Sequence, residues 1–448
     1  MKEFSIIDQT IRDAQQSLWG HRMSIDMVIP IIPVMDQVGY KEIAVPGGRG
    51  LIAFFRYFRE NPFERLRLFA KGFQKTPLRS TFWLWGLSGF DTEPLAAMEL
   101  WIKWACANGI RSFMHVDYQN ETERSSHIAR IAKAEGAKVI TTLLYTLSPV
   151  HTDEVWARKT RKIVERGDCV DEILIDDECA VLTPERARSL VSTVQQNCNG
   201  MPLEFHQHCM TGLAPACYME AIKLGVGAVH TATSPLAGGV SLPSTENILK
   251  NARRLGYSSD LDEEALKAVA DHFRKAAEEH GLELSKPVEY DVFQYEHQMP
   301  GGMTGTTRNQ LAEIGQEHRL EEVQEEIALM RKELGYPVVV TPYSQALGAQ
   351  AIRNITSGER YKVVSDAIIK FTLGLWGELD APMDQNVKDK ILSSPRAKKW
   401  LNWKMPEITV EELRRAIGPG LSDEELLLQL LDPRGEVRDK LDALYGRK

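Results

Sequence analysis

Two histidines separated by one residue, His206 and His208, end a predicted β-strand. Because side chains alternate between the two faces of a strand, residues two apart point to the same side. Two neutral imidazoles on one face can bind a divalent cation through one ring nitrogen each. The spacing alone fits two packed or surface histidines equally well, so the neighbouring elements must decide.

Acidic residues follow two other predicted strands. Asp13 comes after the first strand, and Asp176 and Asp177 end the sixth. In a closed barrel the carboxyl ends of all strands face the same mouth, where Asp13 and Asp176 could join the two histidines around one cation with an open position for a substrate oxygen. Each aspartate could instead be a helix cap or a loop carboxylate, and we favour that structural role for Asp177 and for Asp8.

Basic and amide side chains near these positions could bind an anionic substrate. Arg12 could hold a carboxylate in a bidentate pair, with a surface salt bridge as the alternative, and Gln16 could add an amide. The glycine-rich turn Pro46–Gly50 is too short for a phosphate-binding loop and lacks its Lys-Ser/Thr. We therefore expect a loop at the barrel rim that carries Arg49.

Short apolar runs alternate with longer amphipathic stretches over the first ~255 residues, which is the pattern of βα units on a parallel sheet. Eight such units predict a TIM barrel. An open doubly wound sheet is less favoured, because no GxGxxG opens the first helix. The predicted strands are Phe4–Asp8, Glu42–Val45, Ser80–Trp85, Ser112–Asp117, Lys138–Tyr145, Glu172–Asp176, Leu203–His208 and Ala228–Ala232.

The rest of the chain is predicted to be mostly α-helical. A glycine-rich segment, Glu296–Gly305, should break the helical period. We expect a metal-binding barrel domain over residues 1–285 and a helical domain over 286–448. The predicted helices are Leu261–His280, Arg319–Leu334, Glu411–Ile417 and Asp423–Leu431.

The composition indicates which partners and which cellular compartment to expect. Hydrophobic residues make up 43% and the net charge is −8, which gives no electrostatic reason to expect nucleic acid or an anionic membrane as partner. The six cysteines form no CxxC pair, and no apolar run approaches the ~18 residues of a membrane span. With no apolar signal core at the N-terminus, we expect a reduced, cytoplasmic protein.

Six segments carry motifs in the order of a known enzyme family: Asp8–Leu18, Asn61–Arg67, Tyr145–Thr152, His206–Gly212, Tyr295–Met303 and Val339–Pro342. The first reads DQTIRDAQQSL beside the family's D-T-T-x-R-D-A-H-Q-S-L, and the fourth reads HQHCMTG beside H-T-H-D-T-S-G. From residue 4 to residue 435 the chain resembles the carboxyltransferases of pyruvate carboxylase, oxaloacetate decarboxylase α and the keto-acid subunit of transcarboxylase. The resemblance implies a TIM barrel followed by a helical C-terminal domain.

The family binds one divalent ion through an aspartate, two histidines and a carboxylated lysine, which implies Asp13, His206 and His208 here. The place of the lysine falls on Asp176. An aspartate also presents a carboxylate, on a shorter arm, so reaching the ion at ~2.0–2.2 Å requires the strand or ion to shift, or a bridging water. We expect Asp176 as the fourth ligand, and zinc, manganese and cobalt all suit this set.

Three positions depart from the family. Its substrate arginine falls on Trp83, a tyrosine on Phe90, and the threonine that moves a proton between biotin and keto acid on Val240. Valine cannot carry a proton, but Ser241 beside it could. Loss of a charge-assisted contact of roughly 1.5–3 kcal/mol makes pyruvate a poorer fit. The tryptophan suggests a more apolar or bulkier acyl group in the substrate. Arg12 and Arg49 remain as residues that could bind its anionic part.

The resemblance implies a carboxyltransferase component that moves CO2 between carboxybiotin and a keto-acid-like or other acyl substrate. Trp403–Pro406 lacks the Met-Lys-Met of a biotinylation site, so we expect a separate biotin carboxyl carrier protein. The resemblance further implies a biotin carboxylase as a partner, and a homodimer, because the family pairs its barrels. The alternative is a biotin-independent metal-dependent lyase, aldolase or β-keto-acid decarboxylase, favoured by loss of the lysine and threonine. The C-terminal motifs favour biotin, and the retained metal ligands argue against an inactive subunit.

Overall fold

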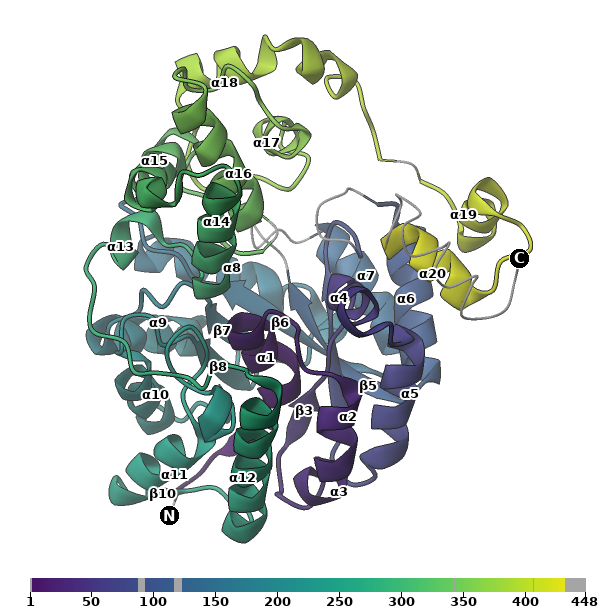
Figure 1. The fold of residues 1–448 in the computed structure, drawn as a ribbon, viewed down its shortest axis with the longest axis vertical. Coiled ribbons are helices and arrows are strands. Elements are labelled where there is room, and N and C mark those ends of the chain that lie inside the picture. Colours follow the sequence, from purple (N-terminus) through teal and green to yellow (C-terminus); the bar gives the residue numbers. More distant parts are fainter. Residues whose placement is uncertain (1, 88–92, 117–122, 342, 406, 432–448) are drawn as a thin grey trace.

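The computed structural model describes residues 2–87, 93–116, 123–341, 343–405 and 407–431. Eight parallel strands, drawn in the lower part of Figure 1, form a closed barrel in which the last strand pairs with the first. The predicted TIM barrel is confirmed. Its strands are β2 (Ser5–Asp8), β3 (Glu42–Ala44), β4 (Leu78–Trp83), β5 (Ile110–Val116), β6 (Lys138–Leu144), β7 (Glu172–Asp177), β8 (Leu203–Gln207) and β9 (Ala228–Thr231).

The barrel strands are buried on both faces, because helices cover the outside and side chains fill the inside. In β7 all six residues are buried; the apolar Ile173, Leu174 and Ile175 form its middle, and its acidic residues lie at the two ends. A short pair, β1 (Lys2–Glu3) with β10 (Tyr257–Ser258), lies beside the barrel. The long covering helices are α4 (Arg49–Phe58), α5 (Pro62–Gly72), α6 (Leu95–Ala107), α7 (Glu123–Ala134), α8 (Asp153–Val164), α9 (Pro184–Asn197), α10 (Ala214–Lys223), α11 (Thr245–Arg254) and α12 (Glu263–His280).

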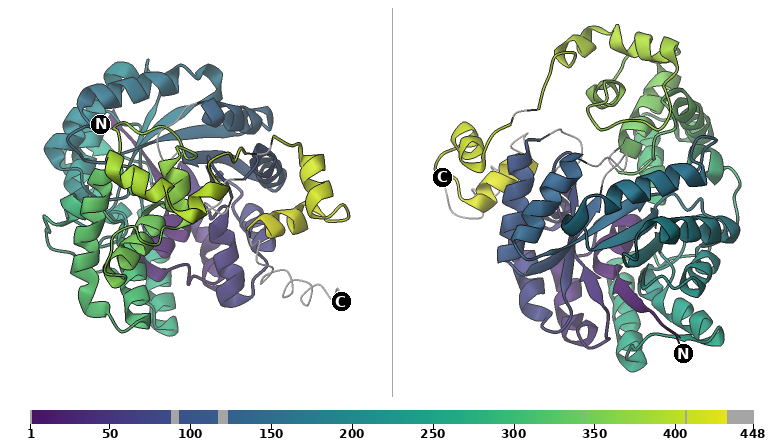
Figure 2. Two further views of the ribbon diagram at one scale, coloured as in Figure 1. Left: turned by 90° about the horizontal axis from the view of Figure 1, so that it is seen from above. Right: turned by 180° about the vertical axis from the view of Figure 1, so that it is seen from behind.

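A mostly α-helical region follows the barrel, as predicted. Viewed from above, its green helices lie over the barrel (Figure 2), while α19 and α20 return to pack against α6. The two parts share one continuous apolar core, and the expected division at residue 285 stays a prediction. The helices of this region are α13 (Gln294–His297), α14 (Gly301–Glu313), α15 (Leu320–Glu333), α16 (Tyr343–Thr356), α17 (Asp366–Thr372), α18 (Gln385–Leu392), α19 (Val410–Ile417) and α20 (Asp423–Leu431).

The glycine-rich segment differs from the expectation. The break is confined to residues 298–300, and Gly301, Gly302 and Gly305 lie inside α14. A Cβ on Gly301 would lie 2.6 Å from Val240, so the glycine lets the helix start touch the loop after β9. Close packing therefore outweighs the weak helix propensity of glycine, about 1 kcal/mol per residue against alanine.

An ion cluster around Asp380, in which Lys159 and His151 are buried and Arg158 is exposed, ties the helical region to the barrel wall. The carboxylate of Asp380 lies 2.7 Å from Lys159 Nζ, 3.1 Å from Arg158 Nη2 and 3.3 Å from His151 Nε2.

In the part of the chain that the structure describes, every helix is too short or too polar to cross a membrane.

Candidate functional site

The first βα loop places two predicted site residues. After β2 the chain forms a π-helical turn, η1 (Thr10–Ala14), before the short helix α1 (Gln15–Trp19). All five residues of the turn are buried, Arg12 and Asp13 among them. Such π-turns are rare and occur often at functional sites. Here the turn brings an arginine and an aspartate to the barrel mouth together.

Asp13 meets both histidines at this mouth. One ligand atom each from Asp13, His206 and His208 lie within 4.8 Å of one another, and all three residues are buried. His206 belongs to β8, and His208 follows its last residue. The nearest approach is 3.2 Å, between His208 Nε2 and Asp13 Oδ1. The predicted convergence of residues far apart in the chain is therefore present.

Asp176 faces the same cluster from the neighbouring strand. It stands opposite His206 in the register of β7 and β8, and its Oδ1 lies 3.9 Å from His206 Nε2. Both carboxylate oxygens are buried without a hydrogen-bond partner among the described residues. Burial, then the negative charges of Glu178 and Asp13, hold the pKa of Asp176 well above its ordinary value. A nearby cation would relieve all three effects.

The unsatisfied atoms fit a divalent cation. Besides the Asp176 oxygens, Nε2 of His206 and Nε2 of His208 lack a hydrogen-bond partner in the described structure. Buried polar atoms are rarely left so. Nδ1 of His208 donates a hydrogen bond to the Val240 carbonyl at 2.8 Å, so Nε2, which faces Asp13, is the atom that would bind a metal after losing its proton. Two imidazoles and two carboxylates are a suitable donor set for zinc, manganese or cobalt.

Burial and the surrounding charges set the protonation state of each proposed ligand. Burial raises the pKa of Asp13, but the Arg12 guanidinium and the His208 ring hold it well below its usual range. Burial holds the pKa of His206 well below its usual value, so this ring is neutral. Burial also lowers the pKa of His208, yet Asp13 raises it to about 9. A metal ion must therefore displace a proton from His208.

The other predicted residues are placed less directly. Arg12 is ion-paired with Asp13, and Gln16 is half-buried in α1. Ser241 is buried, and its hydroxyl lacks a hydrogen-bond partner among the described residues. Arg49 is the first residue of α4, but its side chain lies outside the described part, as does Phe90.

An apolar wall lies on one side of the barrel interior. Trp83, at the end of β4, is half-buried and packs with Trp85 against a cluster of buried apolar side chains. Val338 and Val340, from the segment between α15 and α16, belong to this cluster, so the helical region completes it. The strands β5, β6 and β7 supply Met114, Val116, Ile140, Leu144 and Leu174.

Two aspartates have the structural role expected of them. Asp177 accepts hydrogen bonds from the backbone amides of Val181 and Leu182, at 3.1 and 2.7 Å. Asp8 accepts from the backbone and the hydroxyl of Thr10, at 3.1 and 2.6 Å. Neither carboxylate is needed to explain the cluster of metal-binding atoms.

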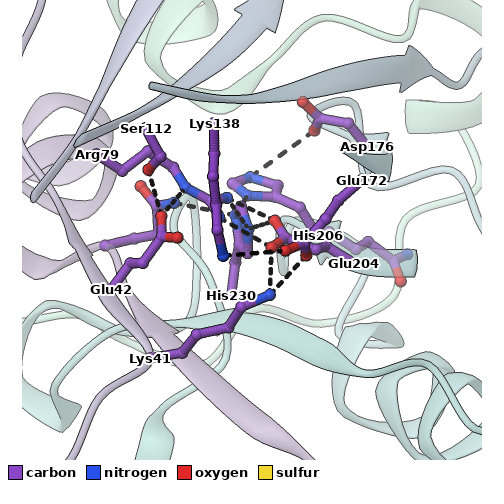
Figure 3. Close-up of polar contacts among 12 residues, drawn as sticks. Lys41, Glu42, Arg79, Ser112, Lys138, Glu172, Asp176, Glu204, His206 and His230 are labelled. Carbon is purple, nitrogen blue, oxygen red and sulfur yellow. Dashed lines mark hydrogen bonds and ion pairs between the residues drawn. The ribbon is translucent and has the colours of Figure 1, made fainter. Parts of the chain in front are cut away.

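Sequence reasoning missed several charged residues of the site. Glu178, two residues after Asp176, carries a charge that raises the pKa of Asp176, and burial and then Asp13 raise the pKa of Glu178 itself. Figure 3 shows a second missed group below the ligands, in which Glu204 and His230 connect His206 to Arg79. The signal available was a charged residue at an inward position of a buried strand, which requires a partner.

Comparisons with known proteins agree with this geometry. A family model described as "Conserved carboxylase domain" matches residues 295–434. A pyruvate carboxylase subunit of Methanocaldococcus jannaschii is 36% identical over 390 residues, which are 86% of this chain and 68% of that protein. The methylmalonyl-CoA carboxyltransferase 5S subunit of Propionibacterium freudenreichii subsp. shermanii is 30% identical over 388 residues, 86% of this chain and 76% of that one.

A solved structure shares the fold. The carboxyl transferase domain of Rhizobium etli pyruvate carboxylase, determined with oxamate and biotin, superimposes with a TM-score of 0.89. The two sequences are 21% identical, and the match covers 100% of this chain and 78% of that one. Taken with the sequence relatives, this shows that the chain belongs to the carboxyltransferase family of the biotin-dependent carboxylases.

Proposed function

We propose that this enzyme moves a carboxyl group between biotin, carried on a separate protein, and an acyl substrate with a C–H bond next to its carbonyl. The observation that carries the proposal is that buried ligand atoms of Asp13, His206 and His208 lie within 4.8 Å of one another, and that Nε2 of both histidines and both oxygens of the neighbouring Asp176 lack a hydrogen-bond partner in the described structure. These four residues would hold one divalent ion, zinc, manganese or cobalt. When bound, such an ion polarises a substrate carbonyl and favours loss of the adjacent proton.

The side chains of this chain would bind and orient the substrate. Arg12 uses part of its guanidinium on Asp13, and its remaining N–H groups can donate to a substrate carboxylate. The Gln16 amide could donate to the same group, and Arg49 would add a second anchor at the rim. Ser241 follows Val240 and has a buried hydroxyl without a described partner; we propose that it would exchange the proton that moves between substrate and biotin.

The apolar wall favours a substrate less polar than pyruvate. Trp83 stands where the family has its substrate arginine, and it is packed in apolar surroundings. A site without that arginine loses roughly 1.5–3 kcal/mol for a second carboxylate contact. The same wall excludes water from a reactive enolate. We therefore propose a keto-acid-like or other acyl substrate with a bulkier apolar part than pyruvate has.

Partners follow from the family. Its members work with a biotin carboxyl carrier and a biotin carboxylase, and we propose both as partners of this chain. The chain spans about two-thirds of the length of the Methanocaldococcus jannaschii relative. We also propose a homodimer and a cytoplasmic site of action, the latter because all six cysteines are buried and unpaired.

Metal analysis tests the ligand set. The wild-type protein, purified with a divalent metal in the medium, should retain about one ion per chain, and Asp176→Ala should retain less. Asp271→Ala, on an exposed position of α12, is the control and should keep the full metal content. Unchanged metal content in Asp176→Ala would remove Asp176 from the set.

An activity assay tests the reaction. Decarboxylation of oxaloacetate and of bulkier β-keto acids is measured with and without metal, and with and without free biotin. A rate that needs metal and rises with biotin supports carboxyl transfer. A metal-dependent rate that biotin leaves unchanged would instead indicate a biotin-independent decarboxylase. Retention of activity after complete metal removal would contradict the proposed site.

A further inference from the structure

A buried ion network fills the barrel below the ligand residues (Figure 3). Arg79 of β4 donates to both carboxylate oxygens of Glu204, at 2.5 and 2.9 Å, and through Nε to Glu42 at 2.5 Å. Lys41 reaches Glu204 from the side, at 3.1 Å. Arg79 and Glu204 are at most 1% exposed. A carboxylate held in this way is fixed in position and stays ionised.

His230 connects this network to a proposed metal ligand. It lies on β9, next to β8, and its ring is completely buried. Its Nε2 lies 3.1 Å from Glu204 Oε2, and its Nδ1 lies 3.1 Å from His206 Nδ1. Glu204 and His206 are two apart on β8, so both point into the barrel on the same side as His230.

The positions of the protons follow from these contacts. An ionised carboxylate can only accept, so the proton on His230 that faces Glu204 must sit on Nε2. The more distant Nη1 of Arg79, at 3.5 Å from the same nitrogen, does not compete. A neutral His230 then has a lone pair on Nδ1. The nitrogen facing it, His206 Nδ1, must therefore carry a proton, which leaves the lone pair of His206 on Nε2.

We propose that His230, held by Glu204 and Arg79, is a positioning residue that fixes the tautomer and ring orientation of His206 for metal binding. The inference rests on the proposed function, since it needs His206 to be a ligand. The Nε2 atom it frees is the buried, unpartnered atom 3.9 Å from Asp176. The arrangement parallels the one at His208, where the Val240 carbonyl 2.8 Å away accepts the Nδ1 proton.

Gln9 supports the same arrangement. Its amide nitrogen lies 2.9 Å from His230 Nδ1, so this lone pair accepts from the Gln9 amide and the His206 ring together. Two donors that point at one nitrogen keep that nitrogen unprotonated. Partners that orient a metal-binding histidine typically contribute 10–100-fold to metal affinity. We expect an effect of that size from His230.

The test measures cobalt binding to apo-protein, because the visible spectrum of Co²⁺ reports its ligand geometry. His230→Phe keeps a ring of similar size but loses both hydrogen bonds. His230→Asn places an amide oxygen near the former Nδ1 and can still accept from His206. The longer side chain of His230→Gln places its amide near Glu204, so no atom is left near the former Nδ1 to accept a hydrogen bond from His206. His115→Phe is the matched control, because His115 is also a buried barrel histidine, and its ring packs at a tilt against Phe82 rather than against His206.

We expect His230→Phe to weaken Co²⁺ binding 10–100-fold and to alter its spectrum, while His115→Phe leaves both unchanged. His230→Asn should recover most of the affinity and the wild-type spectrum. Folding is checked by circular dichroism and by melting without metal. If His230→Phe does not fold, the comparison of His230→Asn with His230→Gln tests the inference. His230→Asn should then bind Co²⁺ at least tenfold more tightly than His230→Gln.

Two results would overturn the role of His230, and a third would contradict the proposed ligand set itself. Wild-type affinity and spectrum in folded His230→Phe would show that His230 does not position His206. Equal binding by the Asn and Gln variants would show the same. If the wild-type protein itself binds no Co²⁺, the proposed ligand set is wrong, and with it the role of His230 in positioning a ligand.

Discussion

Replacing Gly301 by alanine should disturb the proposed metal site from the helical region. A Cβ at this position, the first of α14, would lie 2.6 Å from Cβ and from Cγ1 of Val240 and 3.1 Å from its Cα. Carbon atoms normally approach to about 3.5–4.0 Å, so the helix start or the loop must move by roughly 1 Å. That loop carries the Val240 carbonyl, which accepts the hydrogen bond from His208.

Two effects of known size should follow. Overpacking of this kind costs about 1–3 kcal/mol in the free energy of unfolding. Weakening the partner that orients His208 should also lower metal affinity, by about 10–100-fold if the hydrogen bond is lost. Urea unfolding of the metal-free protein measures the first effect, and calorimetric titration with Zn²⁺ or Co²⁺ measures the second.

Gly305→Ala, in the same helix, is the matched control. A Cβ there would have no atom within 4 Å, and alanine stabilises a helix interior by about 0.5–1 kcal/mol relative to glycine. The two substitutions should therefore change stability in opposite directions. If Gly301→Ala is as stable as Gly305→Ala, the close contact is wrong. A destabilised Gly301→Ala with unchanged metal affinity would refute the coupling to His208.

Three further outcomes are expected. Chelation should lower the melting temperature, and metal at a hundred times its Kd should raise the free energy of unfolding by about 2.7 kcal/mol. His208→Ala should melt at the same temperature with and without metal. Equal melting of the wild-type protein with and without metal would contradict the site. Asp380→Asn should cost about 3 kcal/mol by urea unfolding at pH 7, because Lys159 and His151 stay buried without their carboxylate. Burial raises the pKa of Asp380 but these partners hold it below its usual 3.8, so its stabilising contribution is present above pH 3.8 and the difference from wild type should shrink as the pH falls further. Trp83→Arg should lower the KM for small keto acids about tenfold, while Trp83→Phe should not, and equal KM values in the two variants would count against the substrate argument.

The barrel could be predicted from sequence because its signals are local. Each strand needs a short apolar run that is buried on both faces, and all eight runs were recognisable. The convergence of Asp13 with His206 and His208 then followed from barrel closure, which brings all carboxyl ends to one mouth. Only the boundaries moved, such as β4, which begins at Leu78 rather than Ser80.

The partners of these ligands could not be predicted in the same way. Contact between His206 and His230 depends on how two strands are aligned, and the link to Arg79 crosses the barrel. Neither distance is encoded by spacing along the chain. The position of Glu178 beside Asp176 depends on the path of the chain beyond β7, which strand periodicity does not describe.

The helical region completes the site. Val338 and Val340 belong to the apolar cluster against which Trp83 packs, and Gly301 contacts the loop whose Val240 carbonyl holds His208. The barrel alone would expose part of that apolar wall to water and lose the contact behind one proposed metal ligand, His208. This gives a physical reason why the proposed metal site, built entirely from barrel residues, occurs together with a C-terminal helical region. Changes in that region should alter metal binding without touching a proposed ligand.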